Sequence, residues 1–301
     1  MSDVQPRTDR KWLNALLLAA TLVTTTFTGM FHWLSFDADF QLVEAHITLG
    51  AVANGLWYSL TILGILGAHE LGHYLACRFY RINASLPYFL PVPFPLTGTA
   101  GAFIRIRQPI TTKRALFDIG IAGPLAGFVV AVPALIVGMM LSRVVAVPAD
   151  FQGVSLGEPL LFKAVAWLVW GSPPESASIN MHPMAFAAWF GLLATALNLI
   201  PMGQFDGGHI AYATLGHHAH KITLAAVVFA AGLSLYSSSW IVWSALAVGL
   251  LFAFGWRHPP IWDEAEPLDP TRRWLALLAL VILVLCFTPA PIEPLDLIQP
   301  K

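Results

Sequence analysis

The sequence predicts an all-α polytopic membrane protein with about six to seven transmembrane helices and one re-entrant, hairpin-like segment. Of the 301 residues, 57% are hydrophobic and only 11% are charged, whereas a soluble domain has about 25% charged residues. The mean hydropathy of the chain is +0.68, and its apolar residues gather in runs long enough to cross a bilayer as helices. The formal net charge of −1 gives no indication of nucleic-acid binding.

Seven apolar runs are candidate spans, because roughly 20 helical residues cross the hydrocarbon core. The first follows Arg7, Arg10 and Lys11, as in a signal peptide, but no clean A-x-A site comes after it and we expect it to be retained. Between the third and fourth runs, LLFKAVAWLVW (160–170) fits an interfacial helix or part of a re-entrant segment. The runs are 12–34, 48–77, 115–142, 183–200, 221–237, 239–256 and 271–290.

The distribution of positive charge orients these spans. Basic residues precede the first span and end the second, at Arg78 and Arg81, whereas the loop SFDADFQLVEAH between them carries acids and no Lys or Arg. We therefore expect a cytosolic N-terminus. The short chain shows no transit peptide, which favours a multi-pass protein of a bacterial plasma membrane, with an organellar membrane as the alternative.

The segment 87–109 is apolar but cannot form a regular helix, because prolines recur through PYFLPVPFP. After Gly98 and Gly101, AFIRIR alternates apolar and charged residues as a strand does. Non-helical backbone at membrane depth is tolerated only where protein buries it or where it lines a wet cavity. We expect a re-entrant loop or hairpin that binds substrate as an added strand, near Gly98, Gly101 and Phe103. The alternative is an ordinary cytosolic connecting loop.

The motif HELGH (69–73) lies in the second apolar run. His69 and His73 are four residues apart and share one face of a helix, so both imidazoles can bind one metal ion. Glu70 beside them can act as general base on a metal-bound water. Ionisable groups inside spans are costly and mark function by default. The alternative is a set of polar residues satisfied inside a helix bundle.

A catalytic zinc ion usually takes three protein ligands plus water, so another segment must supply the third. ALNLIPMGQFDGGHI (196–210) offers Asp206, after a span that ends at Pro201. Gly207 and Gly208 let the backbone approach closely there. The predicted orientation places Asp206 at the same membrane depth as the two histidines. The alternative role for Asp206 is that of N-cap of the next helix.

These motifs together, HELGH at 69–73 and NLIPMGQFDGG at 198–208, resemble the site-2 protease family of intramembrane zinc metalloproteases. That family carries H-E-x-x-H in one span and N-x-x-P-x-x-x-x-D-G in a later one, and the chain departs from it only at Phe205, where Leu is frequent. The resemblance covers residues 48–220. It implies one zinc ion held by His69, His73 and Asp206, a water activated by Glu70, and an Asn198 that holds substrate or stabilises the oxyanion.

The resemblance also implies that 87–109 is the re-entrant β-hairpin of such enzymes and that GPLAG (123–127) belongs to their glycine-rich third core helix. No segment is long or polar enough for the PDZ or CBS domain of many relatives, so we expect a minimal, membrane-only member. The expected organisation is one transmembrane protease domain over 1–301, with a catalytic core at about 48–220 and peripheral helices at 1–47 and 221–301.

The predicted function is therefore that of an intramembrane zinc endopeptidase, which cleaves transmembrane protein substrates in the bilayer close to the cytosolic side. A metal or ion transporter would instead use the ligand residues and the His217–His220 cluster as a pathway. A non-catalytic relative would bind and sequester membrane proteins. Glu70 separates these possibilities, because neither a transporter nor a pure binder needs a base at that position.

Other histidines and cysteines have weaker assignments. His209 is expected to have a structural role, and the alternatives are that it supports the ligands or contacts the substrate. The cluster of His217, His218 and His220 fits an interfacial anchor or a weak accessory metal site. Cys77 lies one turn after His73 and could complete the ligand set, although cysteine is more often a small buried apolar residue.

Overall fold

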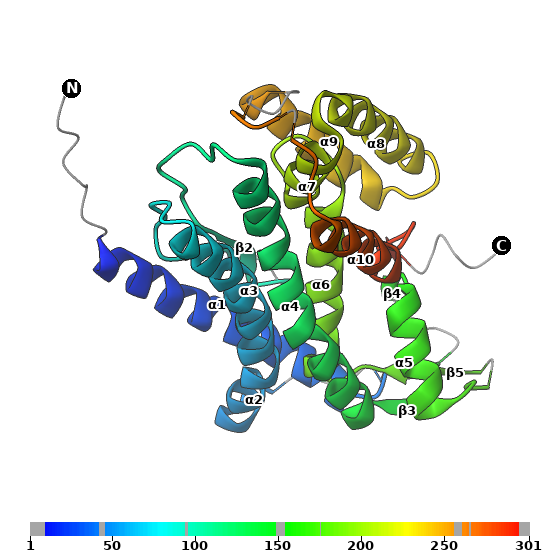
Figure 1. Ribbon diagram of the computed structural model, residues 1–301. Helices are drawn as coiled ribbons and strands as arrows, with labels where there is room; N and C mark the ends of the chain where they lie inside the picture. The colour runs from blue at the N-terminus through cyan, green and yellow to red at the C-terminus, as the bar shows by residue number, and fades with distance from the viewer. Residues whose placement is uncertain are drawn as a thin grey trace.

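The computed structural model describes residues 10–41, 46–93, 96–148, 154–174, 176–255, 261–264 and 266–294. Long helices pack side by side, and three small antiparallel sheets lie around them (Figure 1). The helices are α1 (Lys11–Asp37), α2 (Leu49–Asn54), α3 (Leu56–Phe79), α4 (Lys113–Leu141), α5 (Leu160–Trp170), α6 (Pro183–Leu199), α7 (Asp206–Leu215), α8 (Ala219–Leu233), α9 (Ser239–Phe254) and α10 (Pro270–Cys286), with a 3-10 turn at Gly216–His218. The strand pairs are β1 (Tyr88–Pro91) with β2 (Thr99–Phe103), β3 (Arg143–Ala146) with β5 (Ala177–Asn180), and β4 (Val154–Leu156) with β6 (Ile292–Pro294).

The mainly helical membrane architecture is confirmed, but the count of six to seven spans is not. Within the described ranges, three helical segments are long and apolar enough to cross a membrane: Lys11–Asp37, Leu49–Phe79 and Lys113–Leu141. Helix α6 is apolar but has only 17 residues. Helices α8, α9 and α10 have 15, 16 and 17 residues. At 1.5 Å per residue they extend about 23–26 Å, less than the hydrocarbon core of about 30 Å.

The centre of the molecule is formed by α3, α4 and α6, with α7 packed against α4. Small residues allow this close approach, as is usual between helices in membranes. A Cβ atom at Gly72 of α3 would collide with the carbonyl of Ala122 in α4. A Cβ at Gly127 of α4 would lie 3.3 Å from Cβ of His69. The glycine-rich character predicted for GPLAG therefore has a packing role: it brings α4 against the helix that carries HELGH.

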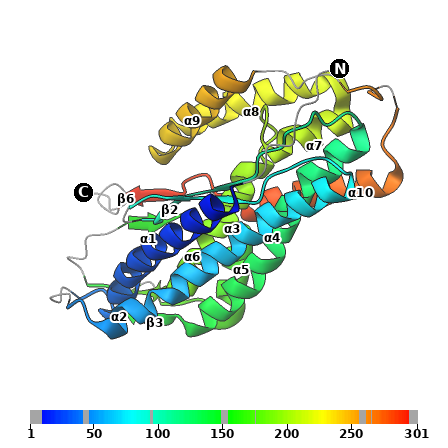
Figure 2. The ribbon, with the colours of Figure 1, turned by 90° about the vertical axis from the view of Figure 1, so that its left-hand side faces the viewer.

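The hairpin expected at 87–109 is present as β1 and β2, with Tyr88 opposite Phe103 and Phe89 opposite Ala102. Residues 94 and 95 of the expected segment lie outside the described ranges. Strand β1 packs on α1, while β2 lies against α3 (Figure 2). The hairpin thus lies between the first helix and the helix that carries HELGH. Its depth in a membrane stays a prediction.

The structure adds elements that the sequence analysis did not anticipate. Helix α7 begins directly at Asp206, and the strands β3, β4, β5 and β6 pair segments far apart in the chain. The segment LLFKAVAWLVW forms α5, an 11-residue helix packed against α4 and α10. It contributes Phe162 and Val165 to the main apolar core.

Candidate metal centre

His69, His73 and Asp206 meet between α3 and the start of α7. The Nε2 atoms of the two imidazoles lie 3.0 Å apart, and Oδ2 of Asp206 lies 3.2 Å from that of His69 and 3.3 Å from that of His73. Both histidines are 7% exposed, and the Asp206 side chain is 15% exposed. Within the described ranges, they are the one group of three or more His, Cys, Asp or Glu residues whose ligand atoms are close enough to share a metal ion.

The tight turn between α6 and α7 carries Asp206 to the histidines. Gly203 has a φ of +47°, which favours glycine. A Cβ at Gly207 would collide with the carbonyl of Leu199, and one at Gly208 with that of Gly203. Only residues without a side chain allow this approach. Phe205 occupies the N-cap position of α7, so Asp206 is not the helix cap that the sequence left open as its alternative role.

The imidazole of His73 is oriented by α4. Its Nδ1 lies 2.7 Å from the carbonyl oxygen of Ile119, to which it donates its proton. This bond leaves Nε2 as the atom that faces His69 and Asp206. Metal-binding histidines are usually oriented by such a bond at the other ring nitrogen.

The donor set fits a zinc ion. With Nε2 of His73 as an acceptor, its lone pair faces a carboxylate oxygen at 3.3 Å, a repulsive arrangement that a cation between the atoms would stabilise. Ligands at about 2.0–2.1 Å in a tetrahedron are separated by about 3.3 Å. The three observed separations of 3.0 to 3.3 Å are close to that value. Two imidazoles and one carboxylate leave the fourth position for water, as in catalytic zinc sites.

Glu70 and Asn198 flank the three candidate ligands. Glu70 is 7% exposed, and α3, which carries it, lies against β2. Asn198, near the end of α6, places Nδ2 3.4 Å from Nε2 of His69. A buried carboxylate and an amide donor therefore lie beside the position a metal ion would take.

The proposed substrate residues of the hairpin differ in their surroundings. Gly98 has a φ of +69° and packs on α1, where Oγ1 of Thr24 donates to its carbonyl at 2.7 Å. Gly101 has a φ of +100°, and a Cβ there would meet open space. Phe103 is 46% exposed and stacks on Tyr88 with ring centroids 5.4 Å apart. Gly101 and Phe103 are therefore accessible, whereas Gly98 is covered by α1.

The remaining histidines and Cys77 lie apart from this centre or contribute no ligand atom to it. Cys77 is fully buried with Ala84, Ala115 and Ile119 in an apolar cluster. The backbone N–H of His209 donates to the carbonyl of Phe205 within α7. The rings of His217 and His218 stack 3.9 Å apart in the 3-10 turn, without a third ligand among the described residues.

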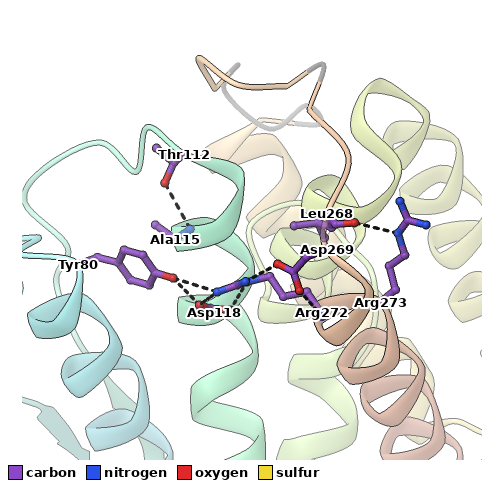
Figure 3. A network of polar contacts seen from close by, with 8 residues as sticks. All are labelled: Tyr80, Thr112, Ala115, Asp118, Leu268, Asp269, Arg272 and Arg273. Atoms are coloured by element: carbon purple, nitrogen blue, oxygen red, sulfur yellow. Dashed lines mark hydrogen bonds and ion pairs between the residues drawn. The ribbon is translucent and has the colours of Figure 1, made fainter.

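A polar network that the sequence analysis missed lies close to Ile119. Arg272 of α10 donates from Nε and Nη2 to the two carboxylate oxygens of Asp118, and from Nη1 to Asp269 (Figure 3). Tyr80, at the end of α3, also donates to Asp118. The Arg272 guanidinium lowers the pKa of the exposed Asp269 carboxyl. The network joins α3, α4 and α10 one residue before the carbonyl that orients His73.

A second polar contact joins the start of α4 to the segment before α10. Nζ of Lys113 donates to the carbonyls of Glu264 and Glu266, both at 2.5 Å, and its backbone N–H donates to Asp263 at 2.7 Å. Lys113 is only 7% exposed. The segment before α10 is therefore held against the same end of α4 as the Arg272 network.

Comparison with known proteins gives the family. The sequence profile of peptidase family M50 matches residues 57–238, more than half of the chain. The chain belongs to peptidase family M50. This is the site-2 protease family that HELGH and NLIPMGQFDGG indicate, so the predicted family, its zinc metallopeptidase class and zinc as the cofactor are confirmed.

Members of the M50 family from plants show similarity over much of the chain. "Probable zinc metalloprotease EGY2, chloroplastic" of Arabidopsis thaliana is 32% identical over 255 residues, which are 83% of this chain and 45% of that protein. "Probable zinc metalloprotease EGY1, chloroplastic" of Oryza sativa subsp. japonica is 32% identical over 203 residues, 64% of this chain and 32% of that protein. "Probable zinc metalloprotease EGY3, chloroplastic" of Oryza sativa subsp. indica is 30% identical over 243 residues, which are 75% of this chain and 40% of that protein. The chain spans about half the length of these relatives or less.

The predicted location in a bacterial plasma membrane, with a cytosolic N-terminus, is wrong. The relatives are named chloroplastic proteins of plants, which points to a plastid membrane. The sequence reasoning failed here because it relied on the shortness of the chain and on the lack of a recognisable transit peptide, and neither feature identifies the membrane. Arg7, one of the basic residues used for the orientation, lies outside the described ranges.

Proposed function

We propose that this chain is an intramembrane zinc endopeptidase that hydrolyses peptide bonds in or near the transmembrane segments of other membrane proteins. The observation that carries the proposal is the convergence of His69, His73 and Asp206 on α3 and α7, with Glu70 in the same buried region. α3 belongs to a segment long and apolar enough to cross a membrane. In this proposal the three converging residues are the zinc ligands.

The residues around the ligands take separate roles in the hydrolysis. Bound zinc supplies Lewis-acid polarisation of the scissile carbonyl and makes a water molecule more acidic. Glu70 accepts the proton of the attacking water and delivers it to the leaving amine. The Asn198 amide, 3.4 Å from Nε2 of His69, donates to the oxyanion that develops on the carbonyl oxygen. Removing such a donor typically costs 10²–10³-fold in rate.

The hairpin supplies a place for an extended substrate. A transmembrane helix hides its peptide bonds in its own hydrogen bonds, so a substrate must unwind locally before it can be cut. β2 lies against α3, and its residues Gly101 and Phe103 are accessible. An unwound segment that adds to this strand would be held beside Glu70. The partners in this proposal are a transmembrane protein substrate and the lipid bilayer, without nucleic acid.

The proposed membrane is that of a plastid, by analogy with the names of the plant relatives. The HELGH motif lies in the second half of α3, so cleavage is proposed on the side of the membrane at which α3 ends. The sequence analysis called this face cytosolic; with the bacterial location withdrawn, it is defined here only by the end of α3.

The metal content of the purified chain tests the ligand set. We expect about one zinc ion per chain in the wild type, and far less in Asp206→Ala, by elemental analysis in detergent. Glu158→Ala is the matched control, because it removes a carboxylate whose side chain is 57% exposed and paired only with Lys163. Zinc content that is indifferent to Asp206 would refute the three-ligand site.

Cleavage assays then separate the protease from its rivals. The probes are labelled casein, which is unfolded, and a reporter with one transmembrane helix. Glu70→Gln should retain zinc and lose cleavage of both probes. A transporter would bind zinc, cleave neither probe and tolerate Glu70→Gln in a zinc-flux assay. A non-catalytic binder would retain the reporter without cutting it.

A further inference from the structure

Helix α1 carries buried polar side chains that bind the backbone of the hairpin segment. Asn14 donates from Nδ2 to the carbonyls of Leu86 and Pro87, at 3.1 and 2.9 Å. Farther along the same helix, Thr24 donates to the carbonyl of Gly98 at 2.7 Å. Nε2 of His32 lies 3.1 Å from the carbonyl of Leu96, and the hydroxyl of Tyr58 in α3 donates to that of Thr97 at 3.0 Å.

These contacts give hydrogen-bond donors to backbone carbonyls of the proline-rich segment. Prolines lack the N–H groups that would pair with neighbouring carbonyls. Backbone carbonyls without partners are costly in a region that excludes water. Side chains of α1 and α3 therefore replace the missing backbone donors, at the base of the hairpin through Asn14 and at its turn through Thr24, His32 and Tyr58.

Asn14 differs from the other donors because only half of its amide is used. It is 7% exposed, and among the described residues its Oδ1 is the one buried side-chain N or O atom without a hydrogen-bond partner. An apolar side chain of similar shape would avoid the cost of burying that oxygen. The asparagine is therefore explained by its two N–H bonds to the hairpin rather than by the packing of α1.

The hairpin connects Asn14 to the helix that carries Glu70. Helices α1 and α3 are antiparallel, because Thr25 bonds to Ser59 at 2.6 Å and Gly29 packs on Gly55. Asn14 is thus at the end of α1 nearest to HELGH.

The residues that Asn14 holds are joined to the neighbouring strand. Tyr88 pairs with Phe103, and the backbone N–H of Ser85 donates to the carbonyl of Arg105 at 3.0 Å. The strand β2 in turn lies against α3, the helix that carries Glu70. Asn14 is therefore linked through the paired strands to the helix that carries Glu70.

We propose that Asn14 is a positioning residue, which fixes the base of the β1–β2 hairpin and so holds β2 in place against α3, the helix that carries the Glu70 carboxyl. The inference rests on the proposed protease function for the role of Glu70, but the link from Asn14 to the hairpin does not depend on it. The side-chain hydrogen bonds of Asn14 go to the backbone of Leu86 and Pro87.

The test uses two shape-matched variants of the full chain, Asn14→Leu and Asn14→Asp, neither of which retains the two N–H donors. Thr21→Val is the matched control, because Thr21 is fully buried on the same helix and donates only to Leu17 of its own helix. Hydrogen exchange of the amides in 85–106, measured by mass spectrometry in detergent, should rise at least severalfold in both Asn14 variants and stay at the wild-type rate in Thr21→Val.

Activity provides the second measurement. With labelled casein as the probe, kcat should fall about 10-fold or more in the Asn14 variants, since small displacements of a catalytic group have effects of this size. Zinc content should stay at the wild-type level. A merely structural role of Asn14 would lower the melting temperature without changing kcat of the folded enzyme, and would overturn the inference.

The two measurements fail independently of each other. If wild type cuts no probe, the proposed function fails, and the exchange data still decide whether Asn14 holds the hairpin. Exchange rates and kcat in the Asn14 variants that equal those of Thr21→Val would refute the inference. If neither Asn14 variant folds, Thr24→Val removes the contact at the hairpin turn and should raise exchange around Gly98; unchanged exchange there would contradict the role of α1.

Discussion

A methyl group at Gly123 should disrupt the metal centre from a neighbouring helix. A Cβ built at this position of α4 lies 2.5 Å from Cδ2 and Cε1 of His73 and collides with Nε2. The ring cannot simply withdraw, because Nδ1 is held by the carbonyl of Ile119 in the same helix. In Gly123→Ala either the imidazole turns away from Asp206 or α3 and α4 separate.

Two costs set the magnitude. Overpacking of a well-packed contact typically costs 1–3 kcal/mol. Loss of the bond that orients a metal-binding histidine typically lowers metal affinity 10- to 100-fold. Zinc affinity, measured by competition with a chromophoric chelator, should therefore fall at least 10-fold in Gly123→Ala, and the melting temperature of the zinc-free protein should fall as well.

Gly64→Ala is the control for this prediction. Gly64 lies on α3 five residues before His69, and a Cβ there meets nothing within 4 Å. Alanine favours a helix over glycine by about 1 kcal/mol, so this variant should bind zinc like the wild type and be at least as stable. The reasoning is refuted if Gly123→Ala and Gly64→Ala bind zinc equally tightly.

Three further predictions concern the polar contacts and the metal. Arg272→Met leaves the partly buried Asp118 without its guanidinium and should lower the free energy of unfolding by about 1–3 kcal/mol. The control Arg273→Met loses one bond to a backbone carbonyl and should change the free energy of unfolding little. Equal shifts of the melting temperature in the two variants would contradict the role of the network. Lys113→Met leaves two carbonyls before α10 without a donor and should lower the free energy of unfolding by about 1–3 kcal/mol. Replacement of the exposed Arg114 in Arg114→Met should change it by no more than about 0.5 kcal/mol, and melting curves of the two variants measure the difference. Removal of zinc with a chelator should lower the melting temperature of the wild type, and added zinc should restore the melting temperature, because a ligand that binds only the folded state stabilises that state. A melting temperature that does not respond to zinc would show that the folded centre does not bind the ion.

The local sequence predicted those parts of the structure that depend on spacing along one element. The interval between His69 and His73 is a helical interval, and the two imidazoles do face one point. The apolar run 160–170 corresponds to one helix from end to end. The turn that carries Asp206 was indicated by Pro201 and the glycines after it. In each case, the residues that determine the structure lie within a few positions of one another.

Contacts between distant segments could not be predicted in this way. Arg272 and Arg273 are adjacent, and the sequence alone does not distinguish them, because both are basic residues beside a span. In the structure, Arg272 binds Asp118 from α4, while Arg273 binds a carbonyl only five residues away. Asn14 is one polar residue in an apolar run, and nothing near it in the chain shows that its partners are Leu86 and Pro87.

The predicted count of spans is not confirmed, for a related physical reason. Apolar composition favours any membrane-embedded helix, but crossing the bilayer requires length as well. Helices α8 to α10 meet the first condition in the sequence and fall short of the second in the structure. The strand pair β4–β6 could not be predicted from local sequence patterns, because it joins Val154–Leu156 to residues after α10.

The candidate centre depends on the placement of backbone groups as well as on its charged side chains. The carbonyl of Ile119 orients His73, the glycine-lined turn brings Asp206, and β2 lies against the helix that carries Glu70. Backbone groups cannot be exchanged by substitution of the residue that bears them, so their positions depend on the side chains that hold each element in place. The residues that hold these elements are the glycines of α4, through close packing, and Arg272 and Asn14, through their hydrogen bonds. We therefore expect the variants most informative about catalysis to lie in α1, α4 and α10 as well as in the two motifs.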